Sequence, residues 1–190
     1  MAAGDLWVFG YGSLIWRPGF PFLSAVPAVL HGYHRAFCVY SEHYRGTPER
    51  RGLVLGLDRG GCCRGMLFHV AADARATVLA YLRERELVTH VYEEKVVPVR
   101  TEAGATVRAV TYVADRRHVQ YAGKLSFEDQ VAVIAGAEGS AGRNRDYLAA
   151  TVAELERLGL VDGVLHRLDR AVRAIPAPPL GDHAVAHLTR

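Results

Sequence analysis

Lysine is nearly absent from this chain of 190 residues. Lys95 and Lys124 are its only lysines, although lysine and arginine together number 23. The arginines that supply the other positive charges are scattered, and no basic stripe carries interleaved aromatic side chains. This pattern disfavours nucleic-acid binding. The formal net charge of +3 is compatible with small acidic substrates without indicating them.

Cysteine is also scarce, and long apolar runs are missing. The chain has three cysteines, Cys38, Cys62 and Cys63, of which the last two are adjacent. An odd number with an adjacent pair is a poor basis for a disulfide framework. It favours a reducing compartment. Residues 1–5 lack the basic region and apolar segment of a signal peptide. No apolar run is long enough to span a bilayer. We therefore expect a cytoplasmic protein without a membrane partner.

Several kinds of site can be set aside. His31 and His34 are the closest histidine pair, but no acidic or cysteine partner stands near them, so no metal site is expected. Gly10 and Gly12 lack the third glycine of a dinucleotide fingerprint. Ser13 lacks the following glycine of a nucleophile elbow. These exclusions leave the features described below: a loop rich in backbone N–H groups, an inward glutamate and a tyrosine hydroxyl. That set suits acid–base chemistry on a small carbonyl compound, without a cofactor.

The stretch Leu6–Trp16 is the most informative part of the chain. It starts as an uncharged apolar run, which predicts a buried strand, and is then interrupted by Gly10 and Gly12 with Tyr11 and Ser13 between and after them. Glycines at a strand end let the backbone bend sharply and let another group approach closely. Two interpretations remain: a loop whose N–H groups hold a substrate, or a tight turn.

The remaining patterns predict strands first and helices last, with one helix inserted. Strands are expected at 25–30 (interrupted by Pro27), 35–40, 53–57, 63–70, 91–99 and 106–113, and helices at 73–87, 127–137, 144–158 and 164–175. A surface loop is expected at 41–51 and a hairpin turn at 58–61. This order predicts an α+β fold, a curved, mostly antiparallel sheet or small barrel with helices packed outside. We expect one domain over 1–175 and a flexible tail over 176–190.

The predicted helix 73–87 ends in two acidic residues that face different ways. Its apolar stripe is expected to comprise Ala72, Ala76, Leu79 and Leu82. Glu86 falls about 20° from Leu79, whereas Glu84 falls on the opposite, solvated side. An inward carboxylate is unfavourable unless it is paired, protonated or useful. Glu86 is therefore either a functional group, a partner of an arginine such as Arg83, or part of a frayed helix end.

Tyr147 presents a similar choice in the predicted helix 144–158. It lies at the margin of an apolar stripe formed by Leu148, Val152 and Leu155. A tyrosine there either packs in the core with its hydroxyl in water or points that hydroxyl into a pocket.

Several of these segments together resemble the ChaC-like gamma-glutamylcyclotransferases, which are specific for glutathione. The matching segments, in family order, are Val8–Trp16, Tyr44–Pro48, Arg51–Leu55, Tyr81–Glu86 and Gly142–Leu148. The resemblance implies a gamma-glutamylcyclotransferase-like barrel and the conversion of glutathione to 5-oxoproline and cysteinylglycine. It extends from about Asp5 to about Leu168. The segment 87–90 departs from some relatives, which have two glycines there.

The resemblance also implies roles for individual residues. Glu86 matches the catalytic acid/base, and the substrate-binding positions are Gly10, Tyr11, Gly12, Ser13, Leu14, Ile15, Arg45 and Tyr147. Two alternatives stay open: a cyclotransferase for other γ-glutamyl amino acids or amines, and a non-catalytic regulator or binding protein.

The chemistry implied by the resemblance suits these residues. The α-amine of the substrate attacks its own γ-carbonyl, so no protein nucleophile is required. A single carboxylate can deprotonate that amine and then protonate the leaving amine. Desolvation is expected to raise the pKa of Glu86 towards neutrality. The loop N–H groups would hold either the developing oxyanion or the α-carboxylate.

Overall fold

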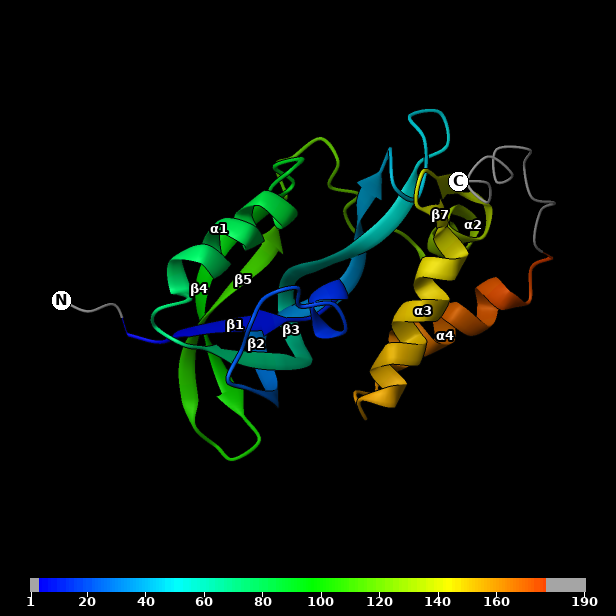
Figure 1. The fold of residues 1–190 in the computed structure, drawn as a ribbon. Coiled ribbons are helices and arrows are strands. Elements are labelled where there is room, and N and C mark those ends of the chain that lie inside the picture. Colours follow the sequence, from blue (N-terminus) through cyan, green and yellow to red (C-terminus); the bar gives the residue numbers. More distant parts are fainter. Residues whose placement is uncertain (1–3, 177–190) are drawn as a thin grey trace, which may run out of the picture.

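A closed five-stranded barrel forms the centre of the computed structural model, which describes residues 4–176 (Figure 1). Its strands are β1 (Leu6–Gly10), β2 (Ser24–Ser41), β3 (Gly52–Val70), β4 (Tyr92–Thr101) and β5 (Thr106–Ala114). In the order β1-β3-β2-β4-β5, neighbours pair antiparallel, and a parallel bridge between Val8 and Val110 closes the barrel. The predicted α+β class with a small curved barrel is confirmed.

The helices occupy two sides of the barrel (Figure 1). A short 3₁₀ helix, η1 (Ser13–Ile15), follows β1, and α1 (Arg75–Glu86) lies alone on one side. On the other side lie α2 (Phe127–Gly136), α3 (Asn144–Arg157) and α4 (Gly163–Arg173), with a two-stranded hairpin of β6 (Glu138–Gly139) and β7 (Gly142–Arg143) between α2 and α3. The predicted helices are confirmed to within one or two residues.

The predicted hairpin at 58–61 is wrong. The strands predicted at 25–30 and 35–40 form the single strand β2, and those at 53–57 and 63–70 form β3. Gly60 and Gly61 have φ of 99° and 68°, and the β2–β3 register shifts between His31 and Tyr33. The glycines therefore form a bulge that bends a long two-stranded ribbon. The chain reverses instead in the predicted surface loop, between Ser41 and Gly52.

The buried face of α1 also differs from the prediction. Ala72 precedes the helix, and both Ala72 and Ala76 are exposed. The buried residues are Val78 and Leu82, which pack with apolar side chains of β1, β3 and β5 in a cluster distinct from the main core. Val78, Leu82 and Glu86 are spaced by four residues, so Glu86 continues the buried line of the helix by one turn.

None of the helices within residues 4–176 combines the length and the apolar character needed to cross a bilayer. The predicted tail at 176–190 lies, apart from Pro176, outside the described residues.

Candidate active site

A small cavity of about 70 Å³ brings together segments that are far apart in the sequence. Its walls are formed by Tyr11, Gly12, Ser13, Leu14, Leu55, Glu86, Tyr92, Tyr112 and Tyr147. Thus the loop after β1, the last residue of α1 and the first turn of α3 meet at one place. The sequence identified Glu86, Tyr147 and most of the loop, but not Leu55, Tyr92 or Tyr112.

Three predicted site residues lie outside this wall. Gly10 is buried behind it, where an added Cβ would come within 3.1 Å of the Leu14 Cβ and 3.2 Å of the Phe68 ring. A larger residue at this position would therefore push against Leu14 and Phe68, where the loop folds back on β1. Ile15 is part of the main core. Arg45 lines a neighbouring groove rather than the cavity itself.

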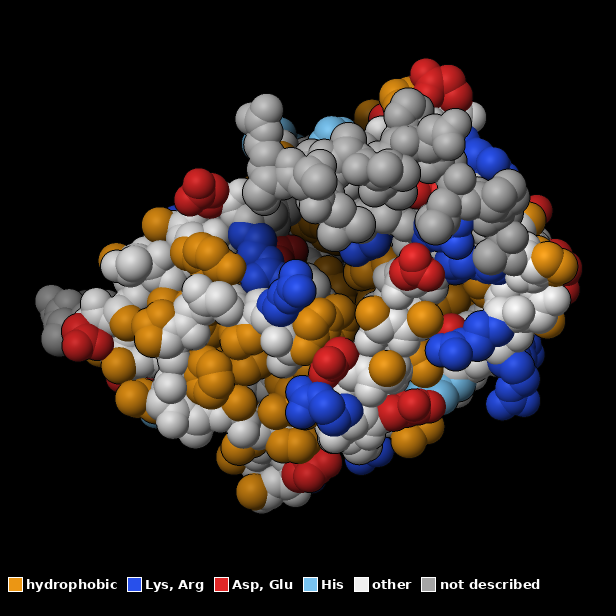
Figure 2. All heavy atoms as spheres, turned by 45° about the vertical axis from the view of Figure 1, so that its right-hand side comes forward, with side chains coloured by type: hydrophobic (Ala, Val, Ile, Leu, Met, Phe, Trp, Pro, Cys, Tyr) orange, Lys and Arg blue, Asp and Glu red, His pale blue; other side chains and the backbone are white. Residues whose placement is uncertain are grey.

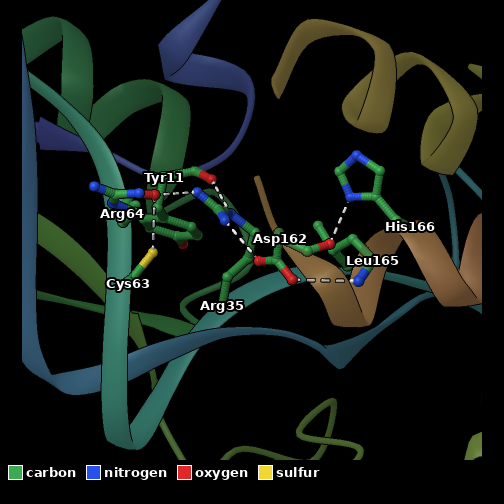
Figure 3. Close-up of polar contacts among 7 residues, drawn as sticks. All are labelled: Tyr11, Arg35, Cys63, Arg64, Asp162, Leu165 and His166. Atoms are coloured by element: carbon green, nitrogen blue, oxygen red, sulfur yellow. Dashed lines mark hydrogen bonds and ion pairs between the residues drawn. The ribbon is translucent and has the colours of Figure 1, made fainter. Parts of the chain in front are cut away.

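The loop after β1 is held from behind by Arg35, a buried residue of β2 (Figure 3). Arg35 Nε donates to the Tyr11 carbonyl at 2.5 Å, and Nη2 donates to the Arg64 carbonyl at 2.6 Å. Nη1 pairs with Asp162 Oδ2 at 2.8 Å, and Asp162 Oδ1 accepts from Leu165 N at the start of α4. One side chain thus connects the loop, β3 and α4.

Among the described residues, Glu86 is the only acidic side chain on the cavity wall. Its side chain is 16% exposed, and Oε1 lies 3.2 Å from Arg85 Nε. Burial raises the pKa of the Glu86 carboxyl above its ordinary value, and the positive charge of Arg85 opposes this shift. The predicted direction of the pKa shift is confirmed. Glu84 is exposed, as expected.

The suggested pairing of Glu86 with Arg83 is wrong. Arg83 instead forms a bidentate pair with Glu94, with distances of 2.7 and 2.8 Å. The ion pair of Glu86 is with its neighbour Arg85, which also reaches across to the loop, where Nη2 donates to Ser13 Oγ at 2.9 Å. Arg85 thereby joins the end of α1 to η1, a role that local sequence did not indicate.

Four tyrosines share the cavity wall with Glu86. The Tyr92 hydroxyl donates to the Leu55 carbonyl at 2.7 Å, and the Tyr112 hydroxyl donates to Glu94 Oε2 at 3.1 Å. Burial raises the pKa of Tyr11, Tyr92 and Tyr112, and raises that of Tyr147 to about 12. All of these hydroxyls are therefore protonated near neutral pH and serve as neutral hydrogen-bonding groups.

Tyr147 is positioned by the start of α3. The fully buried Asn144 side chain accepts from Leu53 N at 2.6 Å and donates to the Leu53 carbonyl at 2.7 Å, as a paired strand would. Tyr147 lies one turn later, with its ring edge-on to Phe37 at 6.0 Å. Of the two interpretations of Tyr147, the structure supports the one in which it lines a pocket.

Two larger grooves adjoin the cavity. One, of about 640 Å³, shares Glu86 and Tyr92 with it; we name it the β2 groove, and its lining includes the end of β2, the following loop, and Val88 and Thr89. Two residues of the segment 87–90, Val88 and Thr89, thus border this groove. The other, of about 350 Å³, we name the arginine groove. It is lined by Ser13, Trp16, Arg17, Arg45, Arg85, Asp146, Tyr147 and Ala150.

The described residues contain no group of three or more histidine, cysteine, aspartate or glutamate side chains placed to hold a metal ion. The cavity instead combines one carboxylate of raised pKa, neutral hydroxyls and a backbone loop. Such a set is suited to proton transfer at a polarised carbonyl compound.

Comparison with known proteins places this arrangement in a family. The family model described as ChaC-like protein matches residues 6–175. This chain belongs to the ChaC-like family. Among curated ChaC relatives, the glutathione-specific gamma-glutamylcyclotransferase of Escherichia coli (strain K12) is 33% identical over 179 residues, which cover 94% of this chain and 78% of that protein. Gamma-glutamylcyclotransferase 2-3 of Arabidopsis thaliana is also 33% identical, covering 90% and 89%.

A solved structure supports the same fold. The crystal structure of a yeast gamma-glutamyl cyclotransferase specific to glutathione superposes with a TM-score of 0.81 at 22% identity, covering 90% of this chain and 96% of that one. The predicted resemblance to the ChaC-like proteins, and the barrel fold that it implies, are confirmed.

Proposed function

We propose that this ChaC-like protein is a glutathione-specific gamma-glutamylcyclotransferase that converts glutathione to 5-oxoproline and cysteinylglycine. The observation that carries the proposal is the position of Glu86, a buried carboxylate of raised pKa facing the glycine loop. The curated relatives that bear this name span most of the chain and support the choice of substrate.

In the proposed reaction Glu86 relays two protons, one at a time, from the α-nitrogen of the substrate to the leaving nitrogen. Its carboxylate takes a proton from the α-ammonium of the substrate, and the freed amine attacks the γ-carbonyl carbon. The new C–N bond closes a five-membered ring. The bond to the cysteine nitrogen then breaks, and protonated Glu86 gives its proton to that nitrogen. The carboxylate next takes the second proton from the ring nitrogen, which becomes the lactam N–H, and passes it to the amine of cysteinylglycine. Atoms balance without water or a cofactor, and Glu86 ends as a carboxylate.

The wall of the cavity would supply binding and charge stabilisation. We assign substrate binding to the loop Gly10, Tyr11, Gly12, Ser13, Leu14 and Ile15, of which Gly10 and Ile15 act from behind the wall. We also assign it to Arg45 and Tyr147. Holding the γ-glutamyl group folded provides the intramolecular advantage, which reaches effective molarities of about 10⁵–10⁸ M in favourable systems. Acid–base transfer by Glu86 adds roughly 10²–10⁴-fold.

We further propose that residues 1–175 form a single domain that works in the cytoplasm. The family match over residues 6–175 supports this extent of the domain. The free thiols Cys38, Cys62 and Cys63 are consistent with a reducing compartment.

The test is to incubate the purified protein with glutathione alone and to quantify both products. We expect 5-oxoproline and cysteinylglycine in equal amounts. A panel of other γ-glutamyl amino acids and γ-glutamyl amines should give slower turnover. If one of those donors turned over faster, it would be the substrate in place of glutathione. Absence of product from every donor would favour a regulator or binding protein.

A further inference from the structure

We propose that the arginine groove binds the C-terminal carboxylate of the substrate, so that the protein selects γ-glutamyl peptides that end in a free carboxylate. The inference rests on the proposed function and extends it from the reacting end to the leaving peptide. It assigns Arg17 and Arg45 as specificity-determining residues.

The size of the cavity requires a second subsite. Its volume of about 70 Å³ is far below the roughly 300–1,000 Å³ of typical ligand pockets. A tripeptide whose γ-carbonyl lies beside Glu86 must therefore extend into an adjoining groove. The arginine groove shares Ser13 and Tyr147 with the cavity, whereas the β2 groove shares Glu86 and Tyr92.

Charge distinguishes the two grooves. Arg17, Arg45 and Arg85 line the arginine groove against one acidic residue, Asp146. Arg85 is already paired with Glu86. Within residues 4–176, neither Arg17 nor Arg45 forms an ion pair with an acidic side chain at 4.0 Å or less. Both guanidinium charges are therefore available to a ligand carboxylate.

Arg45 is also held in place. Its Nη1 donates to the Ala141 carbonyl at 2.5 Å, and its Cζ lies 5.3 Å from the centre of the Tyr147 ring. A guanidinium that is already oriented loses less conformational entropy when it binds a carboxylate. Figure 2 shows lysine and arginine side chains gathered beside a hollow near the middle of one face of the molecule.

The β2 groove has the opposite character. Its lining includes the carboxylates of Glu42 and Glu86 and several apolar valine side chains. Arg85 also lines it, but that guanidinium is paired with Glu86, and Glu42 is paired with Arg51 at 3.1 Å. A peptide carboxylate in that groove would lose its hydration without gaining a free cation, because Arg51 and Arg85 are already paired with Glu42 and Glu86. The arginine groove is therefore the favoured subsite.

The test compares glutathione with its analogue in which the glycine carboxylate is converted to an amide. The two share the reacting γ-glutamyl end and differ in one charge. We expect the wild-type protein to prefer glutathione by about tenfold or more in kcat/KM, as expected for a hydrogen bond to a charged group. Arg17→Gln and Arg45→Gln should each reduce kcat/KM for glutathione more than for the amide, so that the preference shrinks.

Two further variants separate this subsite from general electrostatics and from the other groove. Arg108→Gln removes an exposed charge on β5, outside the residues that line the arginine groove, and should preserve the preference. Glu42→Gln should preserve it as well. Equal losses for both substrates in the Arg17 and Arg45 variants, or a preference abolished by Glu42→Gln, would overturn the subsite alone. Absence of product from both substrates would overturn the proposed function and the subsite with it.

Discussion

At the scale of single residues, Glu86 couples activity to stability. Its side chain is largely buried, and burial raises the pKa of its carboxyl in the folded protein above the unfolded value of about 4.3. The folded state therefore binds this proton more tightly than the unfolded state. The contribution of protonated Glu86 to the free energy of unfolding is therefore fully present below the pKa of the unfolded state. It is lost as the pH rises through the pKa of the folded state.

Replacing Glu86 with glutamine should therefore stabilise the fold near neutral pH. The glutamine side chain would not carry the charge that burial disfavours, so its advantage over wild type should grow as the pH rises through the folded pKa and disappear below about pH 4. Urea denaturation of both proteins across this pH range measures the difference. A variant that is less stable than wild type at neutral pH would show that the pair with Arg85 outweighs the burial.

Asn144 is a structural residue with a consequence for the site. Asn144→Ala would leave the buried N–H and carbonyl of Leu53 unpaired, and should lower the free energy of unfolding by roughly 2–4 kcal/mol. Tyr147, one turn later, should shift with it and lower turnover of glutathione. Chemical denaturation provides the measurement. As a control, Ser140→Ala removes an exposed hydroxyl bonded to the His43 carbonyl and should change stability by less than about 0.5 kcal/mol.

At the scale of elements, the loop after β1 depends on the docking of α4. Arg35 contacts the Tyr11 carbonyl and Asp162, the residue that caps α4 (Figure 3). Because a trans peptide directs its carbonyl and its N–H to opposite sides, the bond to the Tyr11 carbonyl turns the Gly12 N–H away from Arg35. Gly12 lies on the cavity wall. Arg35 is thus a positioning residue for the substrate loop.

Two substitutions separate this role from simple stabilisation. Arg35→Met and Asp162→Asn both remove the ion pair. Asp162→Asn should destabilise the fold by about 3–5 kcal/mol because the buried Arg35 charge loses its counter-ion. Arg35→Met should destabilise it by a similar amount because it also removes the donor to the Tyr11 and Arg64 carbonyls. Only Arg35→Met also loses the bond to the Tyr11 carbonyl, and asparagine still caps a helix. We expect kcat to fall by up to about 100-fold in Arg35→Met alone. Equal losses of kcat in both folded variants would refute the positioning role.

At the scale of the whole molecule, the sequence predicted which segments are helices and strands, but not how successive strand segments are connected. The strand and helix patterns were predicted because their periodicity is local. The prediction of a hairpin turn at 58–61 was wrong because Gly60 and Gly61 suit a bulge as well as a hairpin. Only the pairing of this segment with β2 decides between the two.

The residues of the candidate site also fall into those that the sequence identified and those that it did not. The helical wheel and the family resemblance identified Glu86, and the resemblance identified the loop and Tyr147. Tyr92 and Tyr112 come from separate strands that meet the cavity only when the barrel closes, so nothing near them in the sequence marks them. Arg35 gave one local signal, a lone arginine directly before the apolar run at 36–40.

In the proposed cyclisation of glutathione, Glu86 carries the protons. The most direct measurement is the rate of 5-oxoproline formation from glutathione by wild-type, Glu86→Gln and Glu84→Gln proteins, with glutathione binding measured by calorimetry. We expect a loss of roughly 10²–10⁴-fold or more in Glu86→Gln with binding retained, and near-normal turnover in Glu84→Gln, whose side chain is exposed. Near-normal 5-oxoproline formation by Glu86→Gln would contradict the proposal.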